Sequence, residues 1–144
     1  TASTLSALLL AGERYYAAHV GDSRIYMCDE KGLYLLTHDD VSDTGKLFGC
    51  IDQTPDITLQ YLEGDARGMT FLLCSDGLYK RMDYQLMSDK MKVDSKRMAK
   101  EAVEALAGYV TRQGENDNIS LALIKAEGWA GSALPIREGR AWSR

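Results

Sequence analysis

Short apolar runs, separated by turns that contain glycine or aspartate, are the feature that most limits how this chain can fold. The first such runs cover residues 4–11, 15–20, 24–28 and 33–36. Runs of this length and spacing predict β-strands that follow one another as a meander. Because residues 4–11 and 15–20 are apolar at nearly every position, we expect these two strands to be covered on both faces, as in the middle of a layered sandwich.

Three further strands are predicted in the second half of the chain. Strand patterns at residues 57–62 and 70–74 flank a polar turn at residues 63–68. This arrangement predicts that the two strands form an antiparallel pair. A last apolar run covers residues 119–124 and follows another polar turn.

Helical periodicity lies between these strands. It covers residues 84–91 and, more strongly, residues 95–113. Ser95 is a suitable N-cap for the longer helix, and Gly114 is a suitable stop. The apolar face of this helix comprises Met98, Ala102, Ala105, Leu106 and Tyr109.

Length and composition indicate one globular domain. The chain has 144 residues, of which 45% are hydrophobic and 26% charged, so it can bury a single core. We expect the domain to cover residues 1–126. Residues 127–144 predict a tail, because glycine and proline interrupt any periodicity there. Trp129 and Trp142 in this tail would be loosely packed anchors, or would contact the domain or a partner.

Charge and cysteine usage exclude several classes of function. The net charge of −4 and the lack of a long basic run argue against nucleic-acid binding, which rests on clustered lysine and arginine. No apolar run is long enough for a membrane span, and the first residues lack the basic start of a secretory signal. Cys28, Cys50 and Cys74 have no paired spacing, so we expect neither a disulfide framework nor a zinc site, and a cytoplasmic location fits best.

Three aspartates share one setting, in which each lies beside glycine or asparagine and next to an apolar run. They are Asp22 after Gly21, Asp76 before Gly77, and Asp117 before Asn118. Carboxylates at strand ends are held by rigid backbone, and several that converge form the oxygen cage that Mg²⁺ or Mn²⁺ prefers. Aspartate beside glycine is also common in turns that bind nothing, so both interpretations are open from these residues alone.

The two histidines and Cys74 fit structural roles better than catalytic ones. His19 lies near the end of an apolar run, where a hydrogen-bonded structural histidine is expected. His38 precedes Asp39 and Asp40, a group that could assist a metal, although a simple turn is the better expectation. Cys74 lies inside an apolar run and is expected to be a buried thiol rather than a nucleophile.

Five short motifs follow one another along the chain. They are Thr1-Ala2-Ser3-Thr4, His19-Val20-Gly21-Asp22-Ser23-Arg24-Ile25-Tyr26, Leu36-Thr37-His38-Asp39-Asp40, Leu72-Leu73-Cys74-Ser75-Asp76-Gly77-Leu78 and Asp117-Asn118-Ile119-Ser120. In this order they resemble the later motifs of the type 2C family of metal-dependent serine/threonine protein phosphatases. The resemblance covers about residues 1–125. It implies an α+β fold in which two antiparallel sheets pack as a β-sandwich flanked by helices, here as an incomplete domain.

The resemblance also implies roles for individual residues. Asp76 and Asp117 match ligands of one of the family's two catalytic ions, Asp22 matches a ligand of an additional and weaker ion, and Gly77, Asn118 and Gly21 would support them, with Asn118 orienting Asp117. The ions would be Mg²⁺ or Mn²⁺, two or three in the complete domain. They would activate a water that hydrolyses phosphoserine or phosphothreonine in a protein substrate. Apart from these metal ligands, the resemblance implies no catalytic residue in this chain.

Two departures from the family limit what these residues are expected to do alone. The family's phosphate-binding arginine, its first acidic ligand motif and its Asp-Gly-His-Gly motif precede the region that matches Thr1, and none of them occurs here. We therefore expect the C-terminal portion of a phosphatase domain that is inactive in isolation. Residues 41–46 are much shorter than the flap and helix of many relatives, a form that resembles compact bacterial members.

Two other interpretations remain open. The chain could be a pseudophosphatase or protein-binding module whose aspartates are only turn residues, or it could be a small structural or dimerisation domain. Strands at residues 4–11 and 15–20 would have bare edges and apolar faces without further sheet neighbours. We therefore expect a homodimer through this face as a possible assembly.

Overall fold

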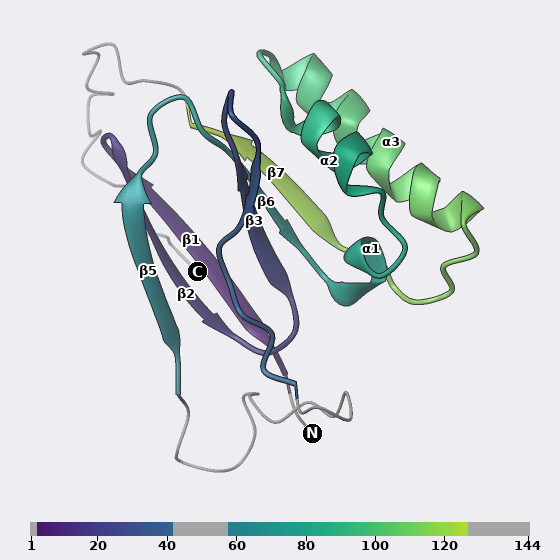
Figure 1. The fold of residues 1–144 in the computed structure, drawn as a ribbon, viewed down its shortest axis with the longest axis horizontal. Coiled ribbons are helices and arrows are strands. Elements are labelled where there is room, and N and C mark those ends of the chain that lie inside the picture. The colour runs from purple at the N-terminus through teal and green to yellow at the C-terminus, as the bar shows by residue number, and fades with distance from the viewer. Residues whose placement is uncertain (1–2, 42–57, 127–144) are drawn as a thin grey trace, which may run out of the picture.

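Two antiparallel sheets and a layer of helices make up the fold (Figure 1). The computed structural model describes residues 3–41 and 58–126. These residues form, in chain order, β1 (Leu5–Ala11), β2 (Arg14–Val20), β3 (Arg24–Cys28), β4 (Leu33–Leu35), β5 (Gln60–Asp65), β6 (Thr70–Cys74), α1 (Asp76–Tyr79), α2 (Tyr84–Met91), α3 (Lys96–Arg112) and β7 (Leu121–Lys125). The first sheet has the order β1-β2-β5 and the second β4-β3-β6-β7. The predicted α+β fold class is confirmed.

The first sheet begins with a tight hairpin. Ala11 pairs with Arg14, so the loop between β1 and β2 has two residues, and Gly12 has a φ of 58°. Glycine adopts this left-handed conformation without a steric penalty, and two-residue hairpins favour it because its twist matches that of the strands. The hairpin sets the register of the sheet, and β5 then pairs with the free edge of β2.

Side chains of the second sheet alternate between two apolar cores. Ile25 and Phe71 point towards the first sheet, where Phe71 lies 5.2 Å from the Tyr15 ring centroid. Tyr26 and Leu72, the next residues along β3 and β6, point towards the helices. Since successive residues of a strand face opposite sides, one pair of central strands fills both cores. Burial of each large apolar side chain contributes about 1.5–3 kcal/mol to folding.

The two longer helices cover the outer side of the second sheet, as Figure 1 shows. The Ser95 side chain accepts the Met98 N–H at 3.2 Å, and α3 buries Ala102, Leu106 and Val110 on one face. This spacing follows the helical period, as predicted. The chain then turns at Gly114, which has a φ of 86°, so the expected cap and stop are both confirmed.

The predicted pairing between the fifth and sixth strands is wrong. The structure places β5 beside β2 in the first sheet, whereas β6 lies between β3 and β7 in the second. The strand β5 also runs on to Asp65, into the stretch expected to be a turn. The connection crosses between the sheets because β6 is apolar on both faces and can be satisfied only between two cores, while β5 is buried on one face.

The expectation that β1 and β2 are covered on both faces is wrong for the residues that the structure describes. Alternate side chains of β1 are exposed, and Leu9 exposes 62% of its surface. Together with Leu5, Tyr16 and Tyr61, it forms what we call the outer face of the first sheet, on which Tyr61 is 76% exposed. The apolar pattern of these strands therefore includes an outer face that the described residues leave exposed.

Some sequence predictions fall outside the described residues. These are the tail at residues 127–144, with Trp129 and Trp142, and the shortened stretch after Val41, with Cys50. The domain boundary at residue 126 therefore remains a prediction. Among the described helices, none is both long and apolar enough to cross a membrane.

Candidate metal centre

The end of β6 places Asp76 at the start of a single helical turn, α1. The strand ends at Cys74, Ser75 is still extended, and Asp76 opens the turn. Ser75 is tied to the segment before β7, because its N–H donates to Ser120 O at 2.9 Å and its Oγ accepts the Ser120 N–H at 3.0 Å. The backbone that carries the Asp76 carboxylate is therefore anchored on a neighbouring segment.

Gly77 brings this turn into contact with Asp117 and Asn118. A Cβ atom at position 77 would lie 2.3 Å from the Asn118 carbonyl oxygen and 3.6 Å from the Asp117 Cβ. A Cβ atom does not tolerate the first distance, so only glycine allows the two segments to pack this closely. The Asp117 segment thus lies directly against the residue that follows Asp76.

The loop that carries Asp117 is held by Glu115, a residue that the sequence does not single out. Glu115 Oε1 accepts the N–H groups of Asn116 and Asp117, each at 2.9 Å, and Arg81 Nε lies 3.3 Å from Glu115 Oε2. Hydrogen bonds from these backbone groups, together with the charge of Arg81, lower the pKa of Glu115. Asn118, which was expected to orient Asp117, donates its backbone N–H to Asp117 Oδ1 at 2.8 Å.

Asp22 reaches the same region from the turn between β2 and β3. Gly21 has a φ of 112°, and a Cβ atom there would lie 2.3 Å from Thr4 Cγ2, so this turn requires glycine. The Tyr79 hydroxyl donates to Asp22 O at 2.6 Å and links the turn to α1. Burial and, next, the negative charge of Asp76 raise the pKa of Asp22. The charge of Asp76 therefore disfavours the ionised form of Asp22.

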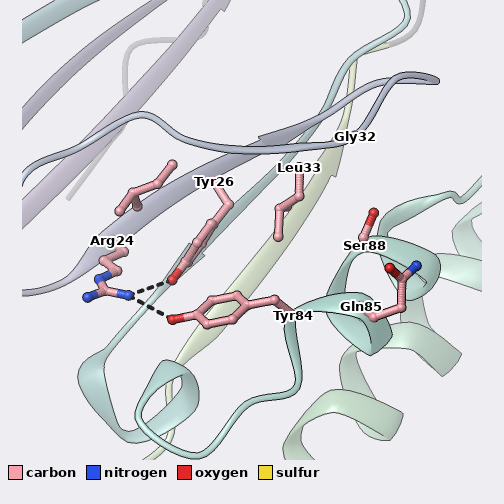
Figure 2. A pocket seen from close by; sticks show the side chains of 8 residues that line it. Arg24, Tyr26, Gly32, Leu33, Tyr84, Gln85 and Ser88 are labelled. Atoms are coloured by element: carbon pink, nitrogen blue, oxygen red, sulfur yellow. Dashed lines mark hydrogen bonds between the residues drawn. The ribbon is translucent and has the colours of Figure 1, made fainter.

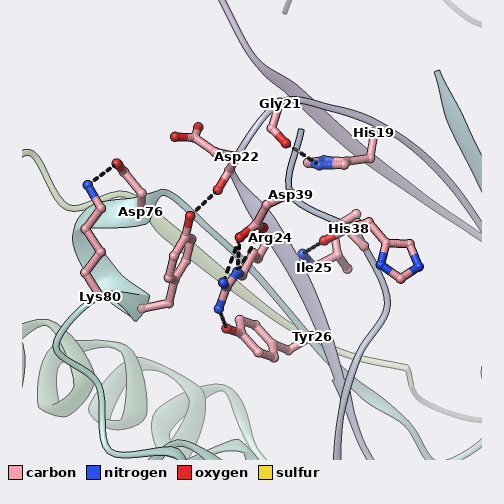
Figure 3. Close-up of polar contacts among 12 residues, drawn as sticks. His19, Gly21, Asp22, Arg24, Ile25, Tyr26, His38, Asp39, Asp76 and Lys80 are labelled. Atoms are coloured by element: carbon pink, nitrogen blue, oxygen red, sulfur yellow. Dashed lines mark hydrogen bonds and ion pairs between the residues drawn. The ribbon is translucent and has the colours of Figure 1, made fainter. Parts of the chain in front are cut away.

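Lys80 balances the charge of these carboxylates (Figure 3). Its Nζ lies 2.7 Å from Asp76 Oδ2, one helical turn along the chain. The hydrogen bond to Asp76 raises the pKa of Lys80, and the charges of Asp117 and Asp22 act in the same direction. The sequence does not reveal this role, because lysine four residues after aspartate is an ordinary helical pair.

Arg24 fixes the adjoining part of the second sheet. Its guanidinium binds the Asp39 carboxylate through two nitrogens, at 2.7 Å from Nη2 and 3.0 Å from Nε. The guanidinium carbon also lies 3.6 Å from the centroid of the Tyr79 ring. Burial disfavours the charge of Arg24, but hydrogen bonds to Asp39 and Tyr26 raise its pKa overall. Paired hydrogen bonds of this kind combine charge with fixed geometry, so they hold β3 against the Asp39 segment.

The expectation that residues 38–40 form a simple turn is wrong. Asp39 binds Arg24, and Asp40 Oδ2 accepts the Gly21 N–H at 2.8 Å. His38 makes backbone hydrogen bonds with the Gln60 side chain, at 2.9 and 2.7 Å. The two carboxylates therefore serve long-range contacts, which a local sequence pattern does not reveal.

His19 and Cys74 have the structural roles predicted for them. His19 is fully buried, with Nδ1 2.8 Å from Ser6 Oγ and Nε2 3.1 Å from the Gly21 carbonyl oxygen. Since a carbonyl oxygen only accepts, Nε2 carries the proton and Nδ1 accepts from the Ser6 hydroxyl. Burial raises the pKa of the Cys74 thiol to about 12, so it is not ionised at neutral pH.

Asp22, Asp76 and Asp117 lie on segments that meet at one end of the sandwich, which we call the acidic end. Its side chains are of the kind that binds a hard divalent cation, but the described ligands are too few. Asp22, Asp76 and Asp117 offer carboxylate oxygens, the ligands that Mg²⁺ and Mn²⁺ prefer. Within residues 3–41 and 58–126, no three histidine, cysteine, aspartate or glutamate side chains are grouped closely enough to hold a metal ion. At this end of the sandwich, the Asp76 carboxylate has Lys80 as its counter-charge.

Solved structures similar to this chain include bacterial serine/threonine phosphatases. The catalytic domain of the serine/threonine protein phosphatase PstP, in complex with two manganese ions, is 24% identical with a TM-score of 0.73, over 85% of this chain and 57% of that one. PstP/Ppp of Mycobacterium tuberculosis is 23% identical with a TM-score of 0.71, over 86% and 60%. The S. agalactiae serine/threonine phosphatase is 21% identical with a TM-score of 0.73, over 83% and 57%. The chain thus has the phosphatase fold but spans less than two thirds of these structures.

The sequence itself assigns the family. A family model described as protein phosphatase 2C matches residues 1–120, which is most of the chain. No curated protein matches the sequence significantly. The chain belongs to the protein phosphatase 2C family, as its motifs predict.

Proposed function

We propose that this chain supplies part of the metal site of a phosphatase that hydrolyses phosphoserine and phosphothreonine in proteins. Asp76 and Asp117 would bind one catalytic ion, and Asp22 would bind an additional one. The observation that supports this is the meeting of three distant segments at one end of the sandwich. Gly77 packs on Asp117, and Tyr79 binds the backbone of Asp22.

The residues of the chain would position the carboxylates and balance their charge. When bound, Mg²⁺ or Mn²⁺, at two or three sites of a complete domain, would lower the pKa of a water and polarise the phosphate oxygens. Ser75 holds the backbone that precedes Asp76, and Glu115 holds the backbone N–H of Asp117. Asp76 Oδ2, now 2.7 Å from Lys80 Nζ, would release this lysine in order to coordinate an ion.

Metal binding tests the assignment directly. In a calorimetric Mn²⁺ titration of the 144-residue chain, we expect weak binding that Asp76→Asn abolishes. Asp94→Asn is the matched control, because Asp94 is exposed and does not belong to the acidic end; it should bind as the wild type does. Equal binding by Asp76→Asn and the wild type would contradict the assignment.

We also propose that the 144 residues alone do not hydrolyse phosphate esters. Support comes from the lack of an Asp-Gly-His-Gly motif in the sequence and of a three-ligand group among the described side chains. With millimolar Mn²⁺, we expect no turnover of a phosphopeptide or of nitrophenyl phosphate above background. Metal-dependent turnover that Asp76→Ala abolishes would show that this chain is itself sufficient.

A pseudophosphatase or protein-binding module is the second candidate. The ion pair between Lys80 and Asp76 favours it, because this pair neutralises a proposed ligand without any metal. Failure of the wild-type chain to bind Mn²⁺ at millimolar concentration would support this alternative over the enzyme.

A cytoplasmic location is also proposed. Cys28 and Cys74 are both free thiols and both buried, which suits a reducing compartment. Fractionation of the source cells with an antibody against the chain would test it, and recovery outside the cytoplasm would contradict it.

A further inference from the structure

A pocket lies between β4 and α2, beside Arg24 (Figure 2). Its volume is about 460 Å³, within the usual range for ligand sites. The side chains that carry the argument are those of Arg24, Tyr26, Leu33, Leu35 and Tyr84. The mechanism proposed above uses none of these residues.

The inner wall of the pocket offers hydrogen-bond donors without net charge. Arg24 Nη1 donates to the Tyr26 hydroxyl at 2.9 Å and to the Tyr84 hydroxyl at 3.1 Å. Both phenol oxygens therefore act as acceptors, and the Tyr84 hydroxyl, which belongs to an exposed side chain, has its own hydrogen to donate to a ligand. Asp39 balances the charge of Arg24. Such a wall suits a neutral acceptor, for example a peptide carbonyl, better than a phosphate group.

The remaining wall of the pocket is apolar. Leu35 and Tyr84 are both large and exposed, and Leu33 is partly buried beside them. A ligand that covers exposed apolar side chains of a cavity binds more favourably, by about 25 cal/mol per Å² of apolar surface removed from water. The ligand that satisfies both walls has a carbonyl group next to an apolar side chain, which describes a peptide segment.

The pocket lies within a few residues' reach of the acidic end. Arg24 is two residues after Asp22, and two residues of chain span at most about 7 Å. The Arg24 guanidinium also stacks on Tyr79, whose hydroxyl binds the Asp22 backbone. An extended peptide with its phosphate near the aspartates can therefore place a residue two or three positions away in the pocket.

We propose that this pocket binds an apolar side chain of the phosphoprotein, two or three residues from the phosphorylated one. The exposed Tyr84 hydroxyl donates to the backbone carbonyl of the bound residue. The proposal rests on the proposed function, since the substrate class comes from there. The pocket then selects among phosphoprotein sites by the residue that flanks the phosphate.

Peptide titrations of the full chain, followed by amide chemical shifts in ¹⁵N NMR spectra, test this inference. The reference probe is a peptide in which six alanines flank one phosphoserine. In each other probe, phenylalanine replaces one of these alanines, and the probes together cover every flanking position. We expect one or two positions at which phenylalanine raises affinity roughly tenfold, a usual gain for filling an apolar pocket. The shifts should centre on Gly32, Leu35 and Tyr84.

Three variants decide the outcome. Leu35→Asp should abolish the preference for phenylalanine, and Tyr84→Phe, which keeps the ring but removes the donor, should weaken binding of the preferred peptide. Leu9→Asp makes the same change as Leu35→Asp on the outer face of the first sheet and should keep the preference. Equal affinity for all peptides, or a preference that survives in Leu35→Asp, would overturn the inference.

The same titrations separate this inference from the proposed function. Asp76→Asn should lose Mn²⁺ binding and keep the preference for phenylalanine. A wild-type chain that binds no Mn²⁺ but prefers phenylalanine would refute the metal assignment and leave the pocket supported. A chain that binds Mn²⁺ without any flanking preference would refute the pocket alone.

Discussion

Gly77 lies so close to Asn118 that a Cβ atom on it would stand 2.3 Å from the Asn118 carbonyl oxygen. This contact joins α1, which begins at Asp76, to the loop before β7, which carries Asp117. The packing at the acidic end of the sandwich therefore requires a residue without a Cβ atom at position 77. Because the obstructing atom belongs to the backbone, a side-chain rotation cannot relieve the clash.

Gly77→Ala should destabilise the fold. Forcing an extra methyl group into a packed contact typically costs about 1–3 kcal/mol, which a urea titration of the chain would measure. Gly108→Ala is the matched control. Its Cβ would meet only the flexible end of Arg112, and alanine in a helix is about 0.5–1 kcal/mol better than glycine, so this variant should be slightly more stable. If both variants unfold at the same urea concentration, the close contact at Gly77 is not as described.

Arg24→Lys should cost about 1–3 kcal/mol in the free energy of unfolding. Lysine keeps the charge but cannot bind Asp39 through two nitrogens while it also reaches Tyr26 and Tyr84. Both partners of the ion pair are largely buried, so solvent screens the loss only in part. Arg67→Lys changes an exposed pair with Asp65, which solvent screens, and should leave the urea midpoint nearly unchanged. A small effect at position 24 would mean that its hydrogen bonds do not hold the sheet.

Tyr26 predicts a loss of stability at alkaline pH. Burial raises the pKa of its phenol above the ordinary value near 10. Because the folded pKa lies above the unfolded one, the stability that the neutral phenol contributes is complete below about pH 10 and is lost as the pH rises towards the folded pKa. The slope for one such group is at most about 1.4 kcal/mol per pH unit.

Urea titrations between pH 9 and pH 11 would measure this loss, since these values span the ordinary phenol pKa near 10. The stability of Tyr26→Phe should fall less steeply over this range than that of the wild type. Tyr61→Phe, which changes an exposed ring, should keep the wild-type dependence. Parallel curves for Tyr26→Phe and the wild type would show that this phenol does not titrate differently in the folded state.

The outer face of the first sheet predicts self-association, and we propose a second copy of the chain as its partner. Leu9 and Tyr61 give this face an exposed apolar surface, and among the described strands β1 lies at an edge of the first sheet. Light scattering at micromolar concentration should show a dimer or larger species that salt does not dissociate, because the driving force is apolar.

A matched pair of substitutions tests which surface associates. Tyr16→Lys, on the outer face, should yield a monomer, whereas Tyr34→Lys, on β4, should associate as the wild type does. The two tyrosines are 39% and 41% exposed, so the changes differ mainly in location. A wild-type monomer with a cooperative thermal transition would contradict the prediction.

Local patterns in the sequence predict the individual elements well. Ser95 and Gly114 mark the ends of α3 because capping and left-handed backbone depend on the nearest residues alone. The buried roles of His19 and Cys74 follow from their places in apolar runs. The order of the motifs was enough to predict the family, and the family model that matches residues 1–120 confirms this prediction.

Only the tertiary structure decides which elements meet. The strands β5 and β6 are neighbours in sequence but lie in different sheets, because burial on one face or on both is satisfied by the layers around them rather than by the turn between them. The charges around Lys80 show the same difference. Its ion pair with Asp76 is local in sequence, but the charges of Asp22 and Asp117, which also act on Lys80, belong to distant segments.

The sequence by itself determined most of the strands and the ends of α3, because these depend on residues near one another in the chain. It also determined the family, through short motifs that keep their order along residues 1–120. The tertiary structure decided that Arg24 would bind Asp39 and that Glu115 would hold the loop of Asp117. It also decided that Tyr26 and Tyr84 would share one guanidinium beside a pocket. Electrostatic and hydrogen-bonding partners are set by distance in space. A chain that folds into layers brings together side chains that are far apart in sequence, so the sequence spacing does not predict their contacts.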